Sequence, residues 1–215
     1  MLLKERLICM NSSTVITIGR QFGSGGHDIG KKLASLLEVP FYDKELLTEA
    51  ARSSGLSEEV FKSYDETPTN SLLYSLSVGA YSMGSMGSSY VQLPINHQVF
   101  LAQFDAIRKI ADRGACVIVG RCADYALNER PHCLHVFIHA DLAERIHHVS
   151  ERYQMSEKEA ADLIAKTDKR RQSYYHFYSG KKWGALESYH LTLDSGRLGI
   201  DNAAELIRKF AEWAI

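Results

Sequence analysis

The chain has 215 residues, 45% of them hydrophobic and 24% charged, which is typical of a soluble globular domain. Its 25 lysines and arginines nearly balance its 26 aspartates and glutamates, and the formal net charge is −1. This balance argues against a protein dedicated to binding nucleic acid or a membrane surface, and no apolar run in the sequence is long enough to cross a bilayer.

Residues 1–12 have a short apolar content interrupted by charges. They lack the pattern of a secretory signal, and we expect them to form a disordered extension. The four cysteines, Cys9, Cys116, Cys122 and Cys133, include no C-x-x-C pair. We expect them to be reduced thiols in a cytoplasmic protein.

Two strands and two helices are predicted near the start of the chain. β-branched residues predict a buried strand over 14–18, and apolar residues at helical spacing predict a helix over 29–37, just after a cluster of glycines. The segment 39–43 is typical of a second short strand that ends on Asp43. A helix is expected to follow it and to stop near Gly55.

The stretch 67–98 differs from the rest of the chain, because it is rich in Ser, Gly, Met and Tyr and has no sustained hydrophobic period. Two interpretations are open. The stretch is either a disordered surface loop or a flexible flap that closes over a substrate.

The alternation of strands and helices returns in the second half of the chain. Strands are predicted over 115–120, 133–140 and 189–195. Helices are predicted to begin at Phe100, Asp141 and Ser156, and a last one is predicted over 200–215. The helix from Asp141 is expected to have Leu142 and Ile146 on its inner face. Ser156 and Glu159 have the spacing of a capping box. Apolar strands that alternate with helices predict a parallel sheet covered on both faces, in a single α/β domain over 1–215.

The segment "GRQFGSGGHD" lies between the first strand and the first helix and resembles a phosphate-binding loop in composition. Gly23, Gly25 and Gly26 permit backbone conformations in which several N–H groups converge on phosphate oxygens, next to a positive helix end. The strict pattern G-x-x-x-x-G-K-[ST] does not match, since Arg20 replaces its first glycine and Gly26 replaces its lysine. A turn with a purely structural role is the alternative.

Five segments, in order, resemble the cytidylate-kinase-like family: "ITIGRQFGSGGHDIGKKLASLLEVPFYDKELL", "VIVGRCADYAL", "HVFIHADLAERIHH", "DKRRQSYYHFY" and "YHLTLDSGRLGIDNAAELI". The resemblance covers nearly the whole chain. It implies a three-layer P-loop kinase fold, with a mobile acceptor-binding excursion over 67–98 and a lid over 152–182. It also implies that ATP and Mg²⁺ bind at Gly23, Ser24, Gly25, Gly26, His27 and Asp28.

The missing lysine leaves the loop in need of another positive charge. Arg20 is our candidate, because its planar guanidinium can hold two oxygens of the β- or γ-phosphate; a surface arginine paired with a carboxylate is the alternative. Asp28 is assigned the place where nucleotide kinases usually have a Mg²⁺-binding threonine. It is either a Mg²⁺ ligand or a first-turn acid that stabilises the helix dipole. His27 is expected to add at most an N–H donor.

Two candidate acceptor-binding residues end strands of the predicted sheet. Arg121 follows the strand over 115–120 directly, at the carboxyl edge where α/β folds bind ligands. Related cytidylate kinases have a Gly-Arg-Asp segment here that contacts the acceptor nucleotide, so the resemblance implies this role for Arg121. Cys122 replaces the aspartate of that segment, which leaves Asp124 to compensate. Asp43 either orients the acceptor phosphate or a metal-bound water, or caps the next helix.

Lys169, Arg170 and Arg171 lie on a predicted helix of the lid region. The resemblance implies that lid arginines close onto the transferring phosphate and exclude water, and that Arg145 joins them at the acceptor. Three adjacent positions cannot share one helix face, so we expect one or two of them to point inward. A solvated basic face is the alternative.

The leading hypothesis is ATP-dependent phosphoryl transfer to a cytidylate-like nucleoside monophosphate or a related small molecule, with Arg20, Arg121, Arg170 and Arg171 as catalytic residues. A second hypothesis is a non-catalytic nucleotide-binding protein that has lost the loop lysine. A third is transfer to a hydroxyl compound, which would require a base such as Asp43. Small nucleotides are the expected partners, nucleic acid and membranes are not, and a homodimer is left open.

Overall fold

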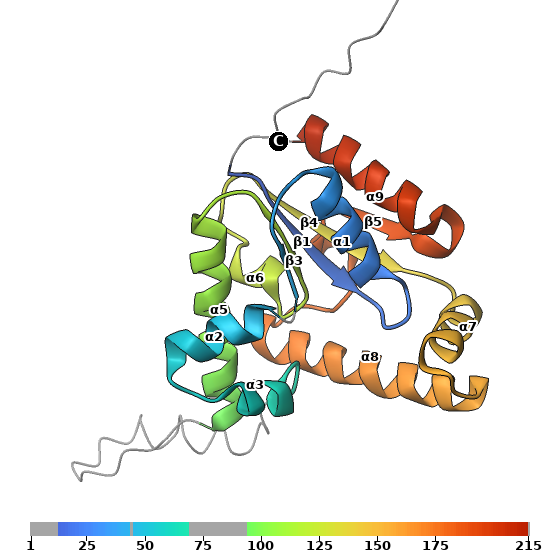
Figure 1. Ribbon diagram of the computed structural model, residues 1–215, viewed down its shortest axis with the longest axis horizontal. Helices are drawn as coiled ribbons and strands as arrows, with labels where there is room; N and C mark the ends of the chain where they lie inside the picture. Colours follow the sequence, from blue (N-terminus) through green and yellow to red (C-terminus); the bar gives the residue numbers. More distant parts are fainter. Residues whose placement is uncertain (1–12, 44, 69–93, 215) are drawn as a thin grey trace, which may run out of the picture.

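A five-stranded parallel sheet forms the centre of the computed structural model, which describes residues 13–43, 45–68 and 94–214. Its strands are β1 (Val15–Arg20), β2 (Phe41–Tyr42), β3 (Cys116–Val119), β4 (Cys133–His139) and β5 (Leu191–Asp194). They are arranged in the order β2-β3-β1-β4-β5, so that β1 lies in the middle between β3 and β4 (Figure 1). The predicted parallel sheet is confirmed.

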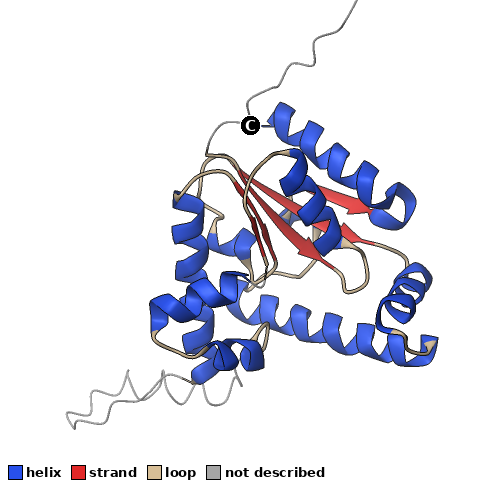
Figure 2. Ribbon diagram, viewed as in Figure 1, coloured by secondary structure: helices blue, strands red, loops and turns tan. Residues whose placement is uncertain are grey.

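Helices cover both faces of this sheet (Figure 2). They are α1 (Gly26–Leu36), α2 (Glu45–Ser54), α3 (Glu58–Tyr64), α5 (Ile95–Asp112), α6 (Ala123–Ala126), α7 (Leu142–Tyr153), α8 (Glu157–Ser179) and α9 (Ser195–Ala214), with a 3₁₀ turn, η1 (Leu186–Ser188). The three layers follow from strands that are apolar on both sides, because each side must be buried against a helix.

Alternate residues of β1 show how the two faces are filled. Ile16 and Ile18 pack in one core cluster with residues of α1 and α9, whereas Val15 packs in another with residues of α5 and α6. Thr17 shares the side of Val15, as the two-residue period of a strand requires. The sheet is therefore closed on both faces, and its open part is the edge where the strands end.

That edge brings together residues from distant parts of the sequence. β1 ends at Arg20, β2 is followed by Asp43, and β3 is followed by Gly120 and Arg121. Because parallel strands all end at the same side of the sheet, these residues become neighbours. The fold thus places the glycine-rich loop after β1 beside Asp43 and Arg121.

Most predicted elements are confirmed, with differences at particular helices. α5 begins at Ile95, five residues before the predicted start at Phe100. The capping box of Ser156 and Glu159 is present at the start of α8. The expectations for residues 1–12 and for most of 67–98 concern positions outside the described residues.

The inner face predicted for α7 is wrong in one position. Leu142 is 54% exposed, whereas Arg145 and Val149 are the buried residues of this helix. α7 is covered by α8 and by the glycine-rich loop rather than by the sheet, so its buried face is shifted toward those two neighbours. A hydrophobic period alone does not show where such neighbours lie.

Two further findings concern the cysteine thiols and the apolar length of the helices. Cys116, Cys122 and Cys133 are free thiols in the structure, as expected, and burial raises the pKa of Cys116 and Cys133 to about 12. Among the helices of the described ranges, none is both long enough and apolar enough to cross a membrane.

A buried histidine on β4 makes the stability of the fold depend on pH. His135 Nδ1 lies 2.8 Å from Thr17 Oγ1 and 3.8 Å from Cys133 Sγ, and its ring stacks on His190 at 5.0 Å between ring centroids. Burial, with smaller contributions from His190 and Lys181, lowers the pKa of His135 to about 4. The folded protein therefore keeps this imidazole neutral at pH values where the unfolded chain protonates it.

We expect the free energy of unfolding to fall as the pH falls from about 7 to about 5. A group whose pKa is lowered by folding stabilises the protein fully above its unfolded pKa, and this stabilisation is lost as the pH drops toward the folded value. From the two pKa values the loss at about pH 5 is roughly 2 kcal/mol. Urea unfolding of the wild-type protein and of His135→Gln at both pH values measures it. The wild-type protein should lose roughly 2 kcal/mol more than the variant; an equal loss in both would contradict the assignment.

Candidate functional site

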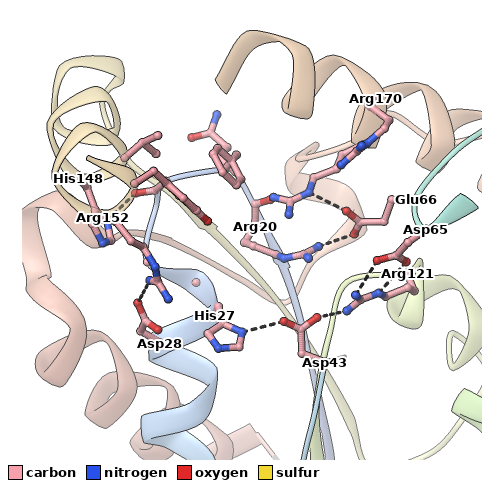
Figure 3. Close-up of a pocket in the computed structure, with 18 residues that line it drawn as sticks. Arg20, His27, Asp28, Asp43, Asp65, Glu66, Arg121, His148, Arg152 and Arg170 are labelled. Carbon is pink, nitrogen blue, oxygen red and sulfur yellow. Dashed lines mark hydrogen bonds and ion pairs between the residues drawn. The ribbon is translucent and has the colours of Figure 1, made fainter. Parts of the chain in front are cut away.

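A cavity of about 290 Å³ opens at the carboxyl edge of the sheet (Figure 3). Its walls come from the loop between β1 and α1, from the ends of β2 and β3, from the chain after α3, and from α7 and α8. The charged lining residues are Arg20, Asp28, Asp43, Asp65, Glu66, Arg121, Arg152, Arg170 and Arg171. Arginines therefore outnumber carboxylates in the lining of this cavity.

The loop over 20–26 is held from its outer side through its carbonyl oxygens. Arg145 Nη1 donates to the Phe22 carbonyl oxygen at 3.2 Å, and His148 Nδ1 lies 2.9 Å from that of Gly23. Ser195 Oγ donates to the Ser24 carbonyl oxygen at 2.6 Å. These contacts come from α7 and from the first residue of α9, so two helices fix the loop with its carbonyl groups turned outward.

The amide groups at the end of the loop, unlike its carbonyl groups, have no hydrogen-bond partner among the described residues. Gly25 caps α1 in a left-handed conformation with φ of 72°, and the N–H groups of Gly26, His27 and Asp28 begin the helix. Within the described residues these three amides donate to no protein acceptor, as is usual for a first helical turn. Unpaired amides at the positive end of a helix dipole form an anion-binding site.

Arg20 and Gly26, the two departures from the usual loop pattern, are structurally linked. A Cβ atom added to Gly26 would lie 2.5 Å from Arg20 Cβ and 3.1 Å from Arg20 Cγ. On the other side, a Cβ atom at Gly120, where φ is +78°, would overlap the Arg20 guanidinium. Glycines on two sides therefore leave room for this buried arginine, and a side chain at position 26 is incompatible with it.

Glu66 lies between two arginines of the cavity. Arg20 Nη1 donates to Glu66 Oε1 at 2.7 Å, and Arg171 Nε donates to Glu66 Oε2 at 2.8 Å. Burial alone would raise the pKa of Glu66, but Arg171 and Arg20 hold it well below the usual range, so the carboxylate is ionised. Burial and the nearby Arg171 lower the pKa of Arg20. One carboxylate thus aligns two guanidinium groups beside the loop.

Arg121 forms a second ionic cluster at the ends of β2 and β3. It donates to Asp43 through Nη1 and to Asp65 through Nε and Nη2, at 3.1 and 2.9 Å. Burial would lower the pKa of Arg121, but Asp65 and Asp43 raise it above the usual value. Asp43 also contacts His27 Nδ1 through Oδ2 at 2.7 Å. The Asp43 side chain therefore pairs with both Arg121 and His27.

Asp28 has a partner on the outer side of the cavity. Arg152 of α7 donates to Asp28 Oδ2 at 2.6 Å, and both side chains are partly exposed. In the strict pattern the hydroxyl residue next to the lysine corresponds to His27, and Asp28 lies one position further into α1.

Arg145 is placed behind the loop rather than in the lining of the cavity. It donates to Asp168 Oδ2 at 2.5 Å, while Asp168 Oδ1 accepts a hydrogen bond from the Phe22 amide at 2.8 Å. The side chain therefore supports the loop together with α8. The structure gives it no position from which to contact an acceptor in the cavity.

The adjacent arginines of α8 both line the cavity, in different ways. Arg171 is held by Glu66 and also donates to the Arg20 carbonyl oxygen at 3.2 Å. Arg170 is exposed, and no ion pair to it occurs among the described residues (Figure 3). Lys169 is exposed and lies outside the lining. Arg170 is thus available to an anion that enters the cavity.

Sequence reasoning missed several residues of the site, namely Asp65, Glu66, His148, Arg152, Asp168 and Ser195. Asp65 and Glu66 follow α3 directly, and nothing in their neighbourhood marks them as ligands. The position of Ser195 directly after the last strand is the one signal available, because strand ends meet at this edge.

Comparisons with known proteins agree with this architecture. The model of the Cytidylate kinase-like family matches residues 15–197. The crystal structure of an uncharacterized protein from Eubacterium ventriosum has 31% sequence identity and a TM-score of 0.69, with 93% of this chain and 98% of that chain covered. A search of curated proteins found no match.

Two shikimate kinases are similar in fold at low identity. The enzyme from Bacteroides thetaiotaomicron has a TM-score of 0.54 at 14% identity, covering 93% of this chain and 98% of that chain. The enzyme from Aquifex aeolicus has a TM-score of 0.50 at 15% identity, covering 94% and 99%. These likenesses confirm the predicted three-layer P-loop kinase fold.

Proposed function

The chain belongs to the cytidylate kinase-like family, and on this premise we propose that it transfers the γ-phosphoryl group of ATP to a small molecule. The observation that carries the proposal is the row of unpaired amides at Gly26, His27 and Asp28, which faces the cavity beside Arg20 and Arg171. Phosphoryl transfer consists mostly of positioning the phosphates and neutralising their charge. This cavity offers the groups that both tasks need.

Arg20 and Arg171 supply the positive charge that the loop lysine provides in other P-loop proteins. Glu66 holds their guanidinium groups side by side, and each retains N–H groups that can donate to phosphate oxygens. Arg170 adds a charge without a carboxylate partner in the described part of the chain. The proposal therefore assigns the γ-phosphate to three arginines from β1 and α8.

Mg²⁺ fits this site as an ion that arrives with the nucleotide. The described residues contain no cluster of three or more potential metal ligands, whereas Mg²⁺ commonly takes one or two carboxylates together with substrate phosphates. Asp28, on the first turn of α1, is the proposed carboxylate. The ion would neutralise charge on the phosphates, and Arg152 would be released from Asp28 when it binds.

Catalytic turnover and the identity of the acceptor are predictions. A protein that only binds nucleotides would show the same amides, so turnover has to be measured directly. The acceptor is either a cytidylate-like nucleoside monophosphate, as the resemblance implies, or another small molecule. A cytoplasmic location, nucleotides as the partners and a homodimer are further predictions.

A pair of glycine substitutions tests nucleotide binding. Gly25 and Gly55 both have left-handed conformations, with φ of 72° and 75°, and an added Cβ would meet nothing closer than 3.7 Å at either. Alanine therefore strains both positions alike. We expect Gly25→Ala to weaken Mg·ATP binding at least about tenfold in calorimetry, because it disturbs the start of α1. Gly55→Ala should bind like the wild type.

The same samples decide between an enzyme and a binding protein. ADP release in the presence of candidate acceptors is the readout, and the wild-type protein should turn over. Calorimetry that detects no heat from any nucleoside triphosphate with Mg²⁺ would remove the proposal altogether. ATP binding without any ADP release would select the binding-only hypothesis.

A further inference from the structure

Arg121, on the acceptor side of the cavity, is already paired with two carboxylates. Asp43 and Asp65 surround the single positive charge of Arg121, so this cluster has an excess of one negative charge. Glu66 is paired with two arginines, Arg20 and Arg171, so the two clusters together carry three positive and three negative charges. The carboxylates at this corner are arranged around Arg121 itself, and they leave little of its charge for an incoming phosphate monoester.

Arg121 has almost no hydrogen-bonding capacity left for such a phosphate. Its Nε and Nη2 donate to Asp65, and its Nη1 donates both to Asp43 and, at 3.0 Å, to the Val119 carbonyl oxygen. A guanidinium has five N–H donors, so a single one remains. A phosphate could bind two N–H groups of Arg121 only by displacing a carboxylate from it.

Asp43, in contrast, faces the cavity and lies close to the amides that would hold ATP. Its carboxylate contacts the side chain of His27, whose own amide belongs to the first turn of α1 (Figure 3). Each Asp43 oxygen makes one contact, to Arg121 or to His27, and each therefore keeps lone-pair capacity for a further hydrogen bond. The carboxylate is thus fixed from two sides and able to accept another proton donor.

We infer that the acceptor reacts through a hydroxyl group and not through a phosphate, and that Asp43 takes the hydroxyl proton. The inference rests on the proposed function and specifies its acceptor. The hydroxyl oxygen forms a bond to the γ-phosphorus of ATP, the bond from that phosphorus to the β–γ bridging oxygen breaks, and ADP leaves with the electron pair. The products are ADP, a phosphate monoester of the acceptor, and a proton on Asp43.

The protonation state of Asp43 agrees with this role. Burial would raise its pKa, but Arg121 and Arg20 hold the pKa below its usual value, so the group is an ionised acceptor at neutral pH. His27 is a positioning residue in this arrangement, because it fixes one Asp43 oxygen. The rate should then be flat through neutral pH and fall only in acid, as Asp43 becomes protonated.

Asp43→Asn tests the inference even when the natural acceptor is not known, because water is itself a hydroxyl acceptor. Single turnovers with Mg·ATP are run with water alone, with a panel of nucleosides, sugars and polyols, and with nucleoside monophosphates. Phosphorus NMR separates monoester, anhydride and inorganic phosphate. We expect monoester or inorganic phosphate as the products of the wild type, and a rate at least about 10²-fold lower in Asp43→Asn. The Kd for Mg·ATP should stay unchanged.

Two variants accompany the test. Asp43→Glu keeps a carboxylate and should recover part of the rate, which a loss of folding would not explain. Asp201→Asn removes an equivalent charge from an exposed ion pair with Lys32, outside the lining of the cavity, and should behave like the wild type.

Several outcomes would overturn the inference. Phosphorylation of a nucleoside monophosphate to an anhydride would show a phosphate acceptor. An Asp43→Asn variant that is as fast as the wild type would remove the base. A variant that loses ATP affinity together with rate would make Asp43 a metal or nucleotide ligand. Failure of the wild-type protein to bind any nucleoside triphosphate would instead contradict the proposed function itself.

Discussion

Arg20→Met is expected to lower the rate of phosphoryl transfer by about 10³-fold, within the range found when an arginine that neutralises the transferring phosphate is lost. Methionine preserves the apolar stem between Gly26 and Gly120 but removes the guanidinium next to Glu66. Glu66 then keeps Arg171 as its partner and turns part of its negative charge toward the phosphate. Single-turnover rates at saturating Mg·ATP measure the loss, and calorimetry gives the accompanying change in Kd.

Arg113→Met is the matched control. Arg113 pairs with Glu49 on the surface, and its side chain is 55% exposed. The substitution removes the same group far from the lining of the cavity, so we expect a rate within about twofold of the wild type, because an exposed ion pair contributes little. Equal rates for Arg20→Met and the wild type would exclude Arg20 as the replacement for the loop lysine.

Gly26→Lys should weaken Mg·ATP binding by at least about 10²-fold, although it restores the lysine of the usual pattern. The new Cβ would lie 2.5 Å from Arg20 Cβ, so either Arg20 or the first turn of α1 has to move. Movement of that turn misdirects the amides of the loop. The substitution is therefore not a simple addition of charge, and the single variant cannot show whether catalysis needs a lysine.

The double variant Arg20→Gly/Gly26→Lys removes this conflict. It rebuilds the pattern G-x-x-x-x-G-K over 20–26 and frees the space that the arginine occupied. We expect it to bind Mg·ATP at least about tenfold more tightly than Gly26→Lys alone, a difference of about 1.4 kcal/mol in binding free energy. Calorimetry on the wild type, both single variants and the double variant completes the cycle. Additive effects would contradict the structural link between the two positions.

Much of the fold could be predicted from the sequence, because its signals are local. The apolar segments over 15–20 and 116–119 alternate with helical patterns, which dictates a parallel sheet. The rule that parallel strands end at one edge then places Asp43 and Arg121 near the loop after β1. Asp43 and Arg121 are therefore predicted as site residues, together with their position at the carboxyl edge of the sheet.

The partners of those residues could not be predicted in the same way. Glu66 is 46 positions from Arg20 and 105 from Arg171, and no period or motif connects them. Arg121 is predicted to contact the acceptor nucleotide, but two carboxylates from other segments surround it. Which charges neutralise one another depends on how distant segments pack, and this information is absent from local patterns.

The long helix α8 is held at its middle and near its C-terminal end. Asp168, at its middle, pairs with Arg145 and accepts a hydrogen bond from the Phe22 amide, while Tyr178, in its last turn, stacks on Phe100 of α5 with ring centroids 3.6 Å apart. Figure 1 shows the helix running from α7 at one end toward α5 and α6 at the other. A continuous helix transmits displacement along its length. A ligand that shifts the loop at Phe22 would therefore also displace Asp168 and, with it, the half of α8 that packs on α5.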